Sequence, residues 1–306
     1  MAAKLEIDLD AFGVWLTEHA QRVEMTLEEL LPEGDVAPEP LHQAMRWAVL
    51  GGGKRVRAAM VYAAGYACHP QLDPAAQQAL DRAAAAVELV HAYSLIHDDL
   101  PCMDDDTMRR GKAATHVQFG EAMALLAGDA MQPLAFEWLA GMAISPALVV
   151  QAVHALAWAI GSDGMAGGQA IDLLSTGETI DELALASMHA KKTGALMVAS
   201  LQIGAIVVGA GSAQRNALRT YAEAIGLAFQ VVDDVLDATT DSDRLGKTAG
   251  KDSASDKATY VSLMGVDRAR ELANELAQQA QAAAGEFGRS GERLVAMAQF
   301  VVRREF

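Results

Sequence analysis

Five aspartates stand within nine positions of one another, and two arginines follow shortly afterwards. They are Asp98, Asp99, Asp104, Asp105 and Asp106, then Arg109 and Arg110. Carboxylates this close repel one another, and the repulsion is relieved by a hard cation such as Mg²⁺, which binds carboxylate oxygens and shares phosphate oxygens. A solvated acidic loop at a helix end is the alternative, and this run alone does not decide between the two.

A second group of aspartates interrupts an apolar stretch much later in the chain. Asp233 and Asp237 are four positions apart, which places both carboxylates on one face of a helix, and Asp234 lies one turn from Asp237. Val231 and Val232 precede them and Val235 and Leu236 lie among them, so a solvated helix face explains this group poorly. Two such groups on separate helices, facing each other across a bundle, could hold several Mg²⁺ ions around one diphosphate.

Basic residues follow an early run of glycines. The run Gly51–Gly53 leads into Lys54 and Arg57, whose spacing places both cations on one helical face, directed at a common anion. It lacks the spacing of a phosphate-binding P-loop, and a helix-ending glycine run before a solvated basic helix is the alternative. His91 precedes Asp98 by seven positions, so the two share a helix face about 10 Å apart.

The composition predicts that helices carry these groups. Of the 306 residues, 52% are hydrophobic but only 5% are aromatic, so the apolar mass consists largely of good helix formers. Apolar residues recur at spacings of three and four in 75–100 and in 215–238, and turn-forming stretches separate such segments. We therefore predict an all-α fold, a large helical bundle in which residues 1–306 form a single domain.

Charge and cysteine content narrow the class of protein further. The net charge of -16 argues against a nucleic-acid partner, and an anionic substrate would need clustered Lys and Arg or metal ions held by carboxylates. Cys68 and Cys102 have no metal-ligand or disulfide-framework spacing. The uncharged stretches Trp138–Ser162 and Thr193–Gln214 contain glycine or proline, and we expect buried core helices rather than membrane spans. A cytoplasmic protein is the expectation.

Six motifs follow one another in a familiar order. They are GGKRVR, HAYSLIHDDLPCMDDDTMRRG, GGQAID, KTGAL, FQVVDDVLD and LGK. In these motifs the chain resembles the trans-isoprenyl (polyprenyl) diphosphate synthases, most of all the bacterial farnesyl diphosphate synthases. The resemblance spans nearly the whole chain and implies an all-helical fold around a central cavity, usually a homodimer. Ala58 in place of a frequent proline, the third glycine before Lys54, and Cys102 inside the Asp loop depart from the pattern.

The resemblance also implies a role for each matching residue. Mg²⁺ ions, three per site, would be bound by Asp98, Asp104 and Asp233, supported by Asp99, Asp105, Asp234 and Asp237. The allylic diphosphate would be held by Arg109, Lys192 and Lys257, with Lys247 as a further phosphate contact. Thr193 and Gln230 would face the carbocation. Isopentenyl diphosphate would be held by Lys54, Arg57, His91 and Arg110.

The implied reaction joins an allylic diphosphate to isopentenyl diphosphate. The allylic C–O bond ionises, the double bond of isopentenyl diphosphate attacks the cation, and the departing diphosphate accepts the proton that is lost. The growing tail would run down the helix before Asp98, where Ser94 and Tyr93 would form the floor of the pocket. A small Ser94 with Tyr93 behind it favours a farnesyl product.

Several alternatives stay open at this point. A geranyl or longer-chain synthase would use the same chemistry. A terpene cyclase would need no isopentenyl diphosphate site, and a non-catalytic partner subunit would be expected to lack one of the Asp groups. An acidic helical scaffold would not explain aspartates inside an apolar helix. The basic pair Arg303 and Arg304 could close over bound diphosphate or be a frayed terminus.

Overall fold

A computed structural model of the chain describes residues 8–178, 180–239 and 258–303. The first half contains α1 (Leu9–Leu30), α2 (Glu39–Val49), α3 (Val56–Cys68), α4 (Pro74–Asp98), the strands β1 (Met108–Arg109) and β2 (Lys112–Ala113), α5 (Thr115–Phe119) and α6 (Glu121–Ala140). The second half contains α7 (Pro146–Ile160), α8 (Met165–Leu174), α9 (Glu182–His189), the π-helical turn η1 (Ala190–Gly194), α10 (Ala195–Val207) and α11 (Ser212–Thr239). The remaining described elements are α14 (Tyr260–Met264), α15 (Val266–Ala284), the 3₁₀ segment η2 (Gly285–Gly291) and α16 (Glu292–Arg303). The predicted all-α fold is confirmed. The described residues contain one hairpin, whose two strands have two residues each.

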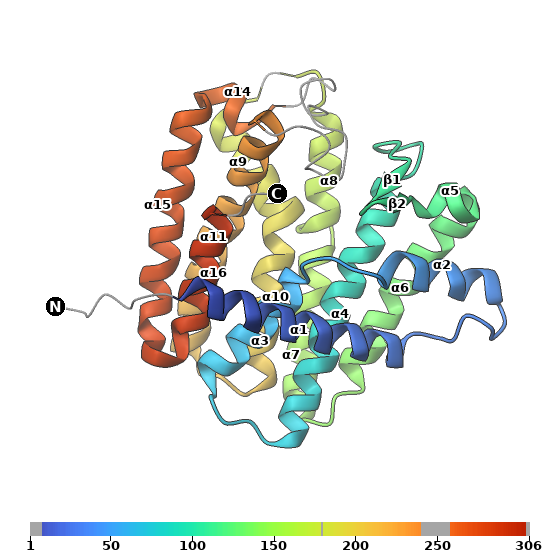
Figure 1. Cartoon of the computed structure of the whole chain (residues 1–306), viewed down its shortest axis with the longest axis horizontal. Coiled ribbons are helices and arrows are strands. Elements are labelled where there is room, and N and C mark those ends of the chain that lie inside the picture. The colour runs from blue at the N-terminus through green and yellow to red at the C-terminus, as the bar shows by residue number, and fades with distance from the viewer. Residues whose placement is uncertain (1–7, 179, 240–257, 304–306) are drawn as a thin grey trace.

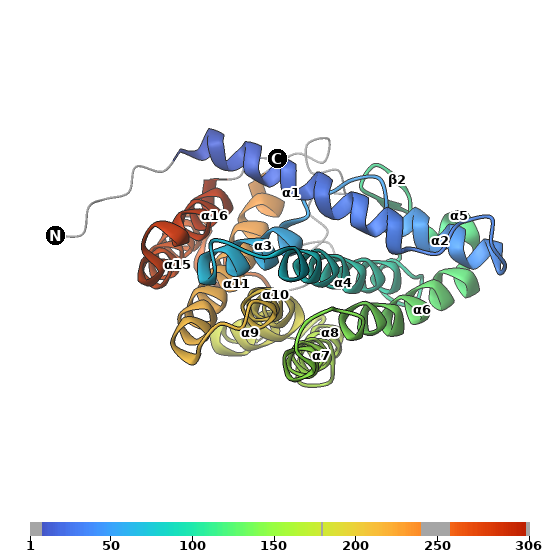
Figure 2. The same ribbon diagram turned by 90° about the horizontal axis from the view of Figure 1, so that it is seen from below.

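The helices pack on one another in layers (Figures 1 and 2). In Figure 2, helix α1 runs along one side of the bundle, α3 and α4 lie beneath it, α10 follows, and α7, α8 and α9 form the opposite side. Helices α15 and α16 close one end by packing on α11. Both α4 and α11 run toward the upper side of Figure 1, so the two helices that carry the Asp groups end on the same side of the bundle.

Helix α4 shows how sequence signals set the bounds of a central helix. Asp73 caps its start by accepting a hydrogen bond from the backbone N–H of Ala76 at 2.8 Å, and Pro74 occupies the first turn, where it costs no hydrogen bond. The expected apolar stripe is buried, from Leu80 through Val90. The helix ends at Asp98, so the first Asp group begins at the last residue of α4.

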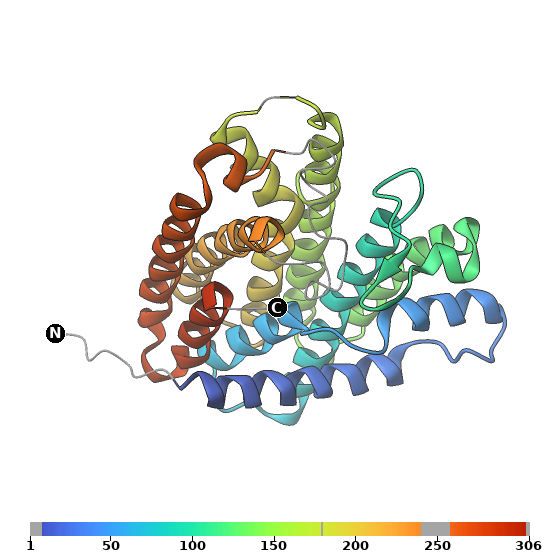
Figure 3. The same cartoon turned by 45° about the horizontal axis from the view of Figure 1, so that its top comes forward.

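Helix α10 is the most buried helix of the central layer. Nearly all its residues are inaccessible to solvent, as expected for a helix without charge. A Cβ on Gly204 would lie 2.3 Å from the backbone oxygen of Val61, so only glycine permits this close approach of α10 to α3. Figure 3 shows α10 enclosed by its neighbours.

The stretch Trp138–Ser162 was expected to be a buried core helix, and this expectation is wrong for α7, which lies within it. Val150 is 67% exposed and Trp158 is 54% exposed, because α7 packs on α10 and α6 with one face only. An uncharged sequence therefore did not distinguish a buried helix from one with an apolar outer face. Within the described parts of the chain, no helix is long and apolar enough to cross a membrane.

Candidate active site

The first Asp group lies on a tight loop between α4 and the β1–β2 hairpin. The backbone N–H of Asp104 donates to the backbone oxygen of Asp98 at 2.8 Å, which folds the loop back over the end of α4. Asp105 adopts a left-handed backbone conformation with φ of 51°, unusual for a residue with a side chain. The loop therefore keeps Asp104 and Asp106 partly buried near the end of α4, whereas Asp105 is exposed to solvent.

The two adjacent aspartates of this group have different surroundings. Asp99 is only 2% exposed, and its carboxylate accepts hydrogen bonds from the guanidinium of Arg109. Arg109 also donates to Asp106 at 3.2 Å. Asp98 is partly exposed instead. Burial raises the pKa of Asp98 to about 6, an effect that nearby Lys192 opposes and Asp104 reinforces.

The second Asp group repeats this division on α11. Asp234 is 3% exposed, and its carboxylate accepts hydrogen bonds from Gln230 Nε2 at 2.9 Å and from the backbone N–H of Tyr260 at 2.8 Å. Asp233 and Asp237 are partly exposed. The prediction that Asp233, Asp234 and Asp237 lie on one helix is therefore confirmed.

Lys192 and Thr193 lie on the π-helical turn η1 between the two Asp groups. Lys192 Nζ is 2.6 Å from Asp172 Oδ2, and Thr193 Oγ1 donates to Gln230 Oε1 at 3.4 Å. A Cβ on Gly168 would lie 2.2 Å from the backbone nitrogen of Lys192, so this glycine lets η1 rest directly on α8. Lys192 is thus positioned by α8 and lies next to Asp98.

Three of the four residues predicted to bind isopentenyl diphosphate lie together. Burial lowers the pKa of His91 well below its usual value, and the next causes are the nearby cations of Arg57 and Arg110. Arg57 in turn has Asp233 among its charged neighbours, and its Nε is buried without a hydrogen-bond partner. Arg57 is therefore the member of this basic group that is also near the second Asp group. A neutral His91 can donate to a phosphate without adding to the local cationic repulsion.

Lys54, the fourth of these residues, is exposed on the glycine loop. Its Nζ lies 6.0 Å from the centre of the Phe300 ring on α16. The C-terminal helix therefore approaches the glycine loop. Arg303, at the end of α16, is exposed and lines a separate cavity of about 480 Å³ together with Arg270.

The sequence analysis assigned no role to the residues that hold the glycine loop in place, although Arg55 is part of the GGKRVR motif. Arg55 is buried, adopts a left-handed conformation with φ of 47°, and donates to Glu24, Glu88 and the backbone oxygen of Val49. Glu88 also accepts from the backbone N–H of Ala58 at 2.9 Å at the start of α3. A glutamate inside the apolar stripe of α4 was the one available signal for this partner.

The residues predicted to set product length lie one turn before Asp98. Ser94 Oγ donates to the backbone oxygen of His91 at 2.9 Å, and Tyr93 is buried with its ring edge-on to His97 at 5.8 Å between centres. His97 faces α6, where its Nε2 lies 3.1 Å from the backbone oxygen of Leu125.

Some predicted residues cannot be placed. Lys247, Lys257 and Arg304 lie outside the described residues. Within the described residues, no three His, Cys, Asp or Glu side chains are arranged closely enough to enclose a metal ion by themselves.

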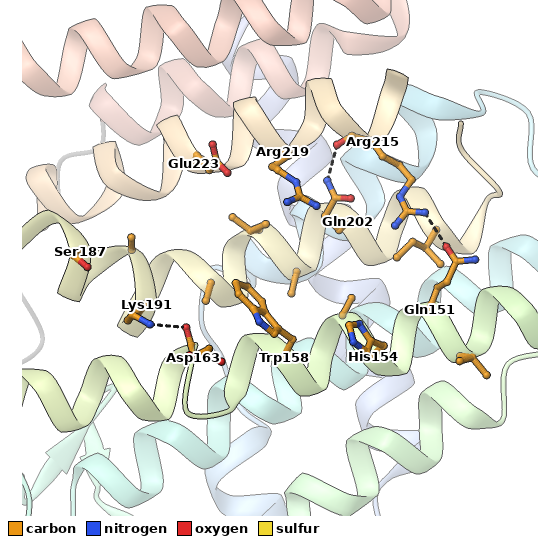
Figure 4. A pocket seen from close by; sticks show the side chains of 17 residues that line it. Gln151, His154, Trp158, Asp163, Ser187, Lys191, Gln202, Arg215, Arg219 and Glu223 are labelled. Atoms are coloured by element: carbon orange, nitrogen blue, oxygen red, sulfur yellow. Dashed lines mark hydrogen bonds between the residues drawn. The ribbon is translucent and has the colours of Figure 1, made fainter. Parts of the chain in front are cut away.

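A large cavity of about 1010 Å³ lies away from the Asp groups, between α7, α10 and α11 (Figure 4). Trp158 and His154 of α7 face Arg215 and Arg219 of α11 across it. Arg215 reaches across the cavity to donate to Gln151 at 2.8 Å. It contains none of the predicted site residues, so its size alone does not make it the reactive centre.

Comparison with known proteins gives one consistent result. The polyprenyl synthetase family model matches residues 38–289. A chloroplastic geranylgeranyl pyrophosphate synthase of Capsicum annuum is 42% identical over 298 residues, which cover 96% of this chain and 79% of the relative. An FPP/GFPP synthase structure from Zymomonas mobilis has a TM-score of 0.86 and 37% identity, covering 96% of this chain and 100% of that chain. A geranyltransferase from Helicobacter pylori, complexed with magnesium and isoprenyl diphosphate, has a TM-score of 0.83 and 30% identity, covering 94% of this chain and 95% of that chain.

The family match, the identities and the shared fold agree with the motif-by-motif resemblance. The chain therefore belongs to the polyprenyl synthetase family, the prenyltransferases of isoprenoid synthesis.

Proposed function

We propose that this chain is a short-chain prenyltransferase that condenses dimethylallyl or geranyl diphosphate with isopentenyl diphosphate, and that farnesyl diphosphate is its main product. One observation carries the proposal: Asp233 and Arg110 are both among the charged neighbours of Arg57, and Arg57 and Arg110 are both among those of His91. A diphosphate held by the Asp groups and another held by the basic group would then be neighbours. A terpene cyclase has no use for the second of these positions.

The carboxylate groups fit Mg²⁺ as a partner. Mg²⁺ binds through one or two carboxylates and completes its coordination with water and substrate phosphate oxygens, so a ligand set of three side chains is not required. Asp98 and Asp104 in one group, and Asp233 and Asp237 in the other, would hold it, and the Helicobacter pylori relative was complexed with magnesium. Bound Mg²⁺ would supply positive charge for the leaving diphosphate. Three ions per site is our proposal for the count.

The side chains around the Asp groups would bind the allylic substrate. Arg109 and Lys192 would hold its diphosphate, and Lys192 is already oriented by Asp172. Thr193 Oγ1 and Gln230 Oε1, which lie 3.4 Å apart, would direct oxygen dipoles at the positive charge that develops when the C–O bond breaks. Asp99 and Asp234 would support the lead carboxylates by fixing the backbone on which they stand.

The basic group would hold isopentenyl diphosphate so that its double bond faces the allylic cation. Arg57, Arg110 and Lys54 would carry the charge, and neutral His91 would donate a hydrogen bond. We propose that the departing diphosphate, and not a side chain, accepts the proton. Lys247 and Lys257 keep their proposed role as phosphate contacts.

Product length is the finer part of the proposal. Relatives with this fold are named for geranylgeranyl and for FPP/GFPP products, so the class of reaction does not fix the length. Ser94 is small and Tyr93 is buried beside it, which supports a pocket that accepts a fifteen-carbon tail and little more. A twenty-carbon product is the second candidate, because the Capsicum annuum relative bears that name.

We also propose that the chain is one domain and forms a homodimer. Helix α1 packs on both α3 and α16, which joins the two ends of the chain in one core. Exposed apolar side chains gather on α6, α7, α8 and α9, including Leu126, Trp158, Leu174 and Leu183. A second copy would cover them. Light scattering should give the mass of two chains, and Trp158→Glu should shift it toward one.

The direct test is a product assay. The purified protein is incubated with Mg²⁺, isopentenyl diphosphate and either dimethylallyl or geranyl diphosphate, and products are identified by chain length. Farnesyl diphosphate should dominate with both allylic substrates. Geranylgeranyl diphosphate as the main product would replace the farnesyl assignment, and pyrophosphate release from an allylic substrate alone would favour a cyclase or a hydrolase.

A further inference from the structure

The β1–β2 hairpin is joined to the end of α2 by a reciprocal pair of side chains. Lys112 Nζ donates to the backbone oxygens of Trp47 at 2.7 Å and Leu50 at 2.9 Å. Trp47 Nε1 in turn donates to the backbone oxygen of Ala113 at 3.0 Å, and Lys112 Nζ lies 4.9 Å from the centre of the Trp47 ring. Carbonyls at a helix C-terminus lack partners within the helix, so a lysine is well suited to this position. Each residue thus binds the backbone of the other's element.

A fourth hydrogen bond extends this connection to the glycine loop. Arg110 Nη1 donates to the backbone oxygen of Gly52 at 3.0 Å. All three residues Gly51–Gly53 have φ between 91° and 123°, and a Cβ on Gly53 would meet the Arg110 guanidinium at 3.1 Å. The glycine loop can therefore lie against the hairpin only because it lacks side chains. We refer to Trp47, Gly52, Arg110 and Lys112 as the joint.

The joint lies between the two proposed diphosphate positions. On one side of the hairpin, Arg109 is the register partner of Lys112 and is anchored to Asp99. On the other side, the glycine loop leads directly into Lys54 and Arg57. The Asp loop is held by its own pair, Arg109 and Asp99, whereas the described contacts of the glycine loop with the hairpin all pass through the joint.

We infer that Lys112 and Trp47 are positioning residues for isopentenyl diphosphate: they hold the glycine loop against the hairpin so that Lys54, Arg57 and Arg110 converge on one diphosphate. This inference rests on the proposed function. Among the described residues, the hydrogen bonds of both side chains go to backbone oxygens of α2 and the hairpin and not to an Asp carboxylate, so we expect their contribution to be to binding geometry and not to ionisation of the allylic substrate.

Kinetics of the full-length enzyme test the inference. Lys112→Met keeps the aliphatic stem over Trp47 and removes the donor, and Trp47→Phe keeps a ring and removes the N–H. Each should raise KM for isopentenyl diphosphate by about tenfold, and leave kcat and KM for geranyl diphosphate within about threefold. The double variant should exceed the larger single effect by less than about threefold, because both residues serve one joint.

Arg46→Met provides the matched control. Arg46 lies on α2 as well and donates to the backbone oxygens of Leu31 and Pro32, away from the hairpin. It should lower the melting temperature without changing KM. If Lys112→Met changes only the melting temperature, as this control does, or changes kcat and both KM values by the same factor, the positioning role is wrong.

A measurement without turnover separates this inference from the proposed function. Hydrogen exchange of the peptide containing Leu50–Arg55 should be faster in Lys112→Met than in the wild type, with the peptide containing Asp99–Asp106 unchanged. Faster exchange together with no prenyl transfer by the wild type would leave the joint intact and overturn the function. Normal prenyl transfer together with unchanged exchange and KM would overturn the joint and leave the function.

Discussion

The two Asp groups share one pattern of burial although the first lies on a loop and the second on a helix. In both, the first of two adjacent aspartates, Asp98 or Asp233, is partly exposed, and the second, Asp99 or Asp234, is buried and hydrogen-bonded within the protein. The partners differ: Asp99 is held by the charged Arg109 of its own loop, and Asp234 by an amide of α11 and a backbone N–H of α14.

The difference in burial between the first and the second aspartate indicates that the two have different roles within each pair. A buried carboxylate is stable only with hydrogen-bond partners, so the second aspartate fixes the position of the backbone. The first aspartate of each pair then stands on a fixed backbone and stays partly exposed. The loop of the first group needs a charged partner because no helix continues through it, whereas the second group gains rigidity from α11.

The lead aspartates should show the largest effect of any substitution. Asp98→Ala and Asp233→Ala should each lower kcat by at least about a hundredfold, because each carboxylate supports charge in the transition state and not core packing. Circular dichroism and melting temperature should stay close to the wild-type values. Near-normal turnover by both folded variants would break the proposed equivalence of the two groups.

The second aspartates should affect stability more than their neighbours do. Asp99→Ala leaves Arg109 with a weaker partner, and Asp234→Ala leaves the backbone N–H of Tyr260 buried without an acceptor. Each should lower the free energy of unfolding by about 2 to 4 kcal/mol, against less than about 1 kcal/mol for Asp98→Ala or Asp233→Ala. Urea unfolding of the four variants measures this. Equal losses at both positions of a pair would contradict the different roles.

His189, which is partly buried next to Tyr260, should make the free energy of unfolding depend on pH. Burial lowers the pKa of His189 to about 4, and its ring stacks on Tyr260 at 5.9 Å between centres. Because the unfolded chain binds this proton near pH 6.5, the contribution of neutral His189 is complete above that pH and is lost as the pH falls toward 4. Between pH 7 and 5, the wild type should lose about 2 kcal/mol more unfolding free energy than His189→Gln. Parallel stability curves for the two proteins would exclude this assignment.

Product length should respond to the helix before the first group only. Ser94 and Phe229 occupy matching places, four residues before Asp98 and Asp233. Ser94→Phe should shift products toward ten carbons and Tyr93→Ala should allow twenty or more, whereas Phe229→Leu should leave the distribution within about twofold of wild type. Chromatography of dephosphorylated products decides. An unchanged distribution in active Ser94→Phe and Tyr93→Ala would mean that the tail does not run along α4.

Local signals in the sequence were sufficient for the two long helices and for the placement of the Asp groups on them. The helix predicted over 75–100 is α4, and that over 215–238 is α11, because cap residues and apolar periodicity act within one turn. The frame behind these carboxylates was not predictable in this way. Asp234 meets a backbone N–H 26 positions away, and Arg55 meets Glu88 at 33 positions. Such pairs depend on how helices pack and leave no local pattern.

Mg²⁺-dependent binding of an inert allylic analogue, geranyl thiodiphosphate, tests most directly whether the two Asp groups act on one diphosphate. Calorimetric titration would compare the wild type, Asp98→Ala, Asp233→Ala and the double variant. Each single variant should weaken Mg²⁺-dependent binding at least about tenfold, and the double variant should lose less than the sum of the two single effects, because both groups hold the same ligand. Strictly additive losses, or wild-type binding by either single variant, would show that the groups do not share a diphosphate and would contradict the proposed site.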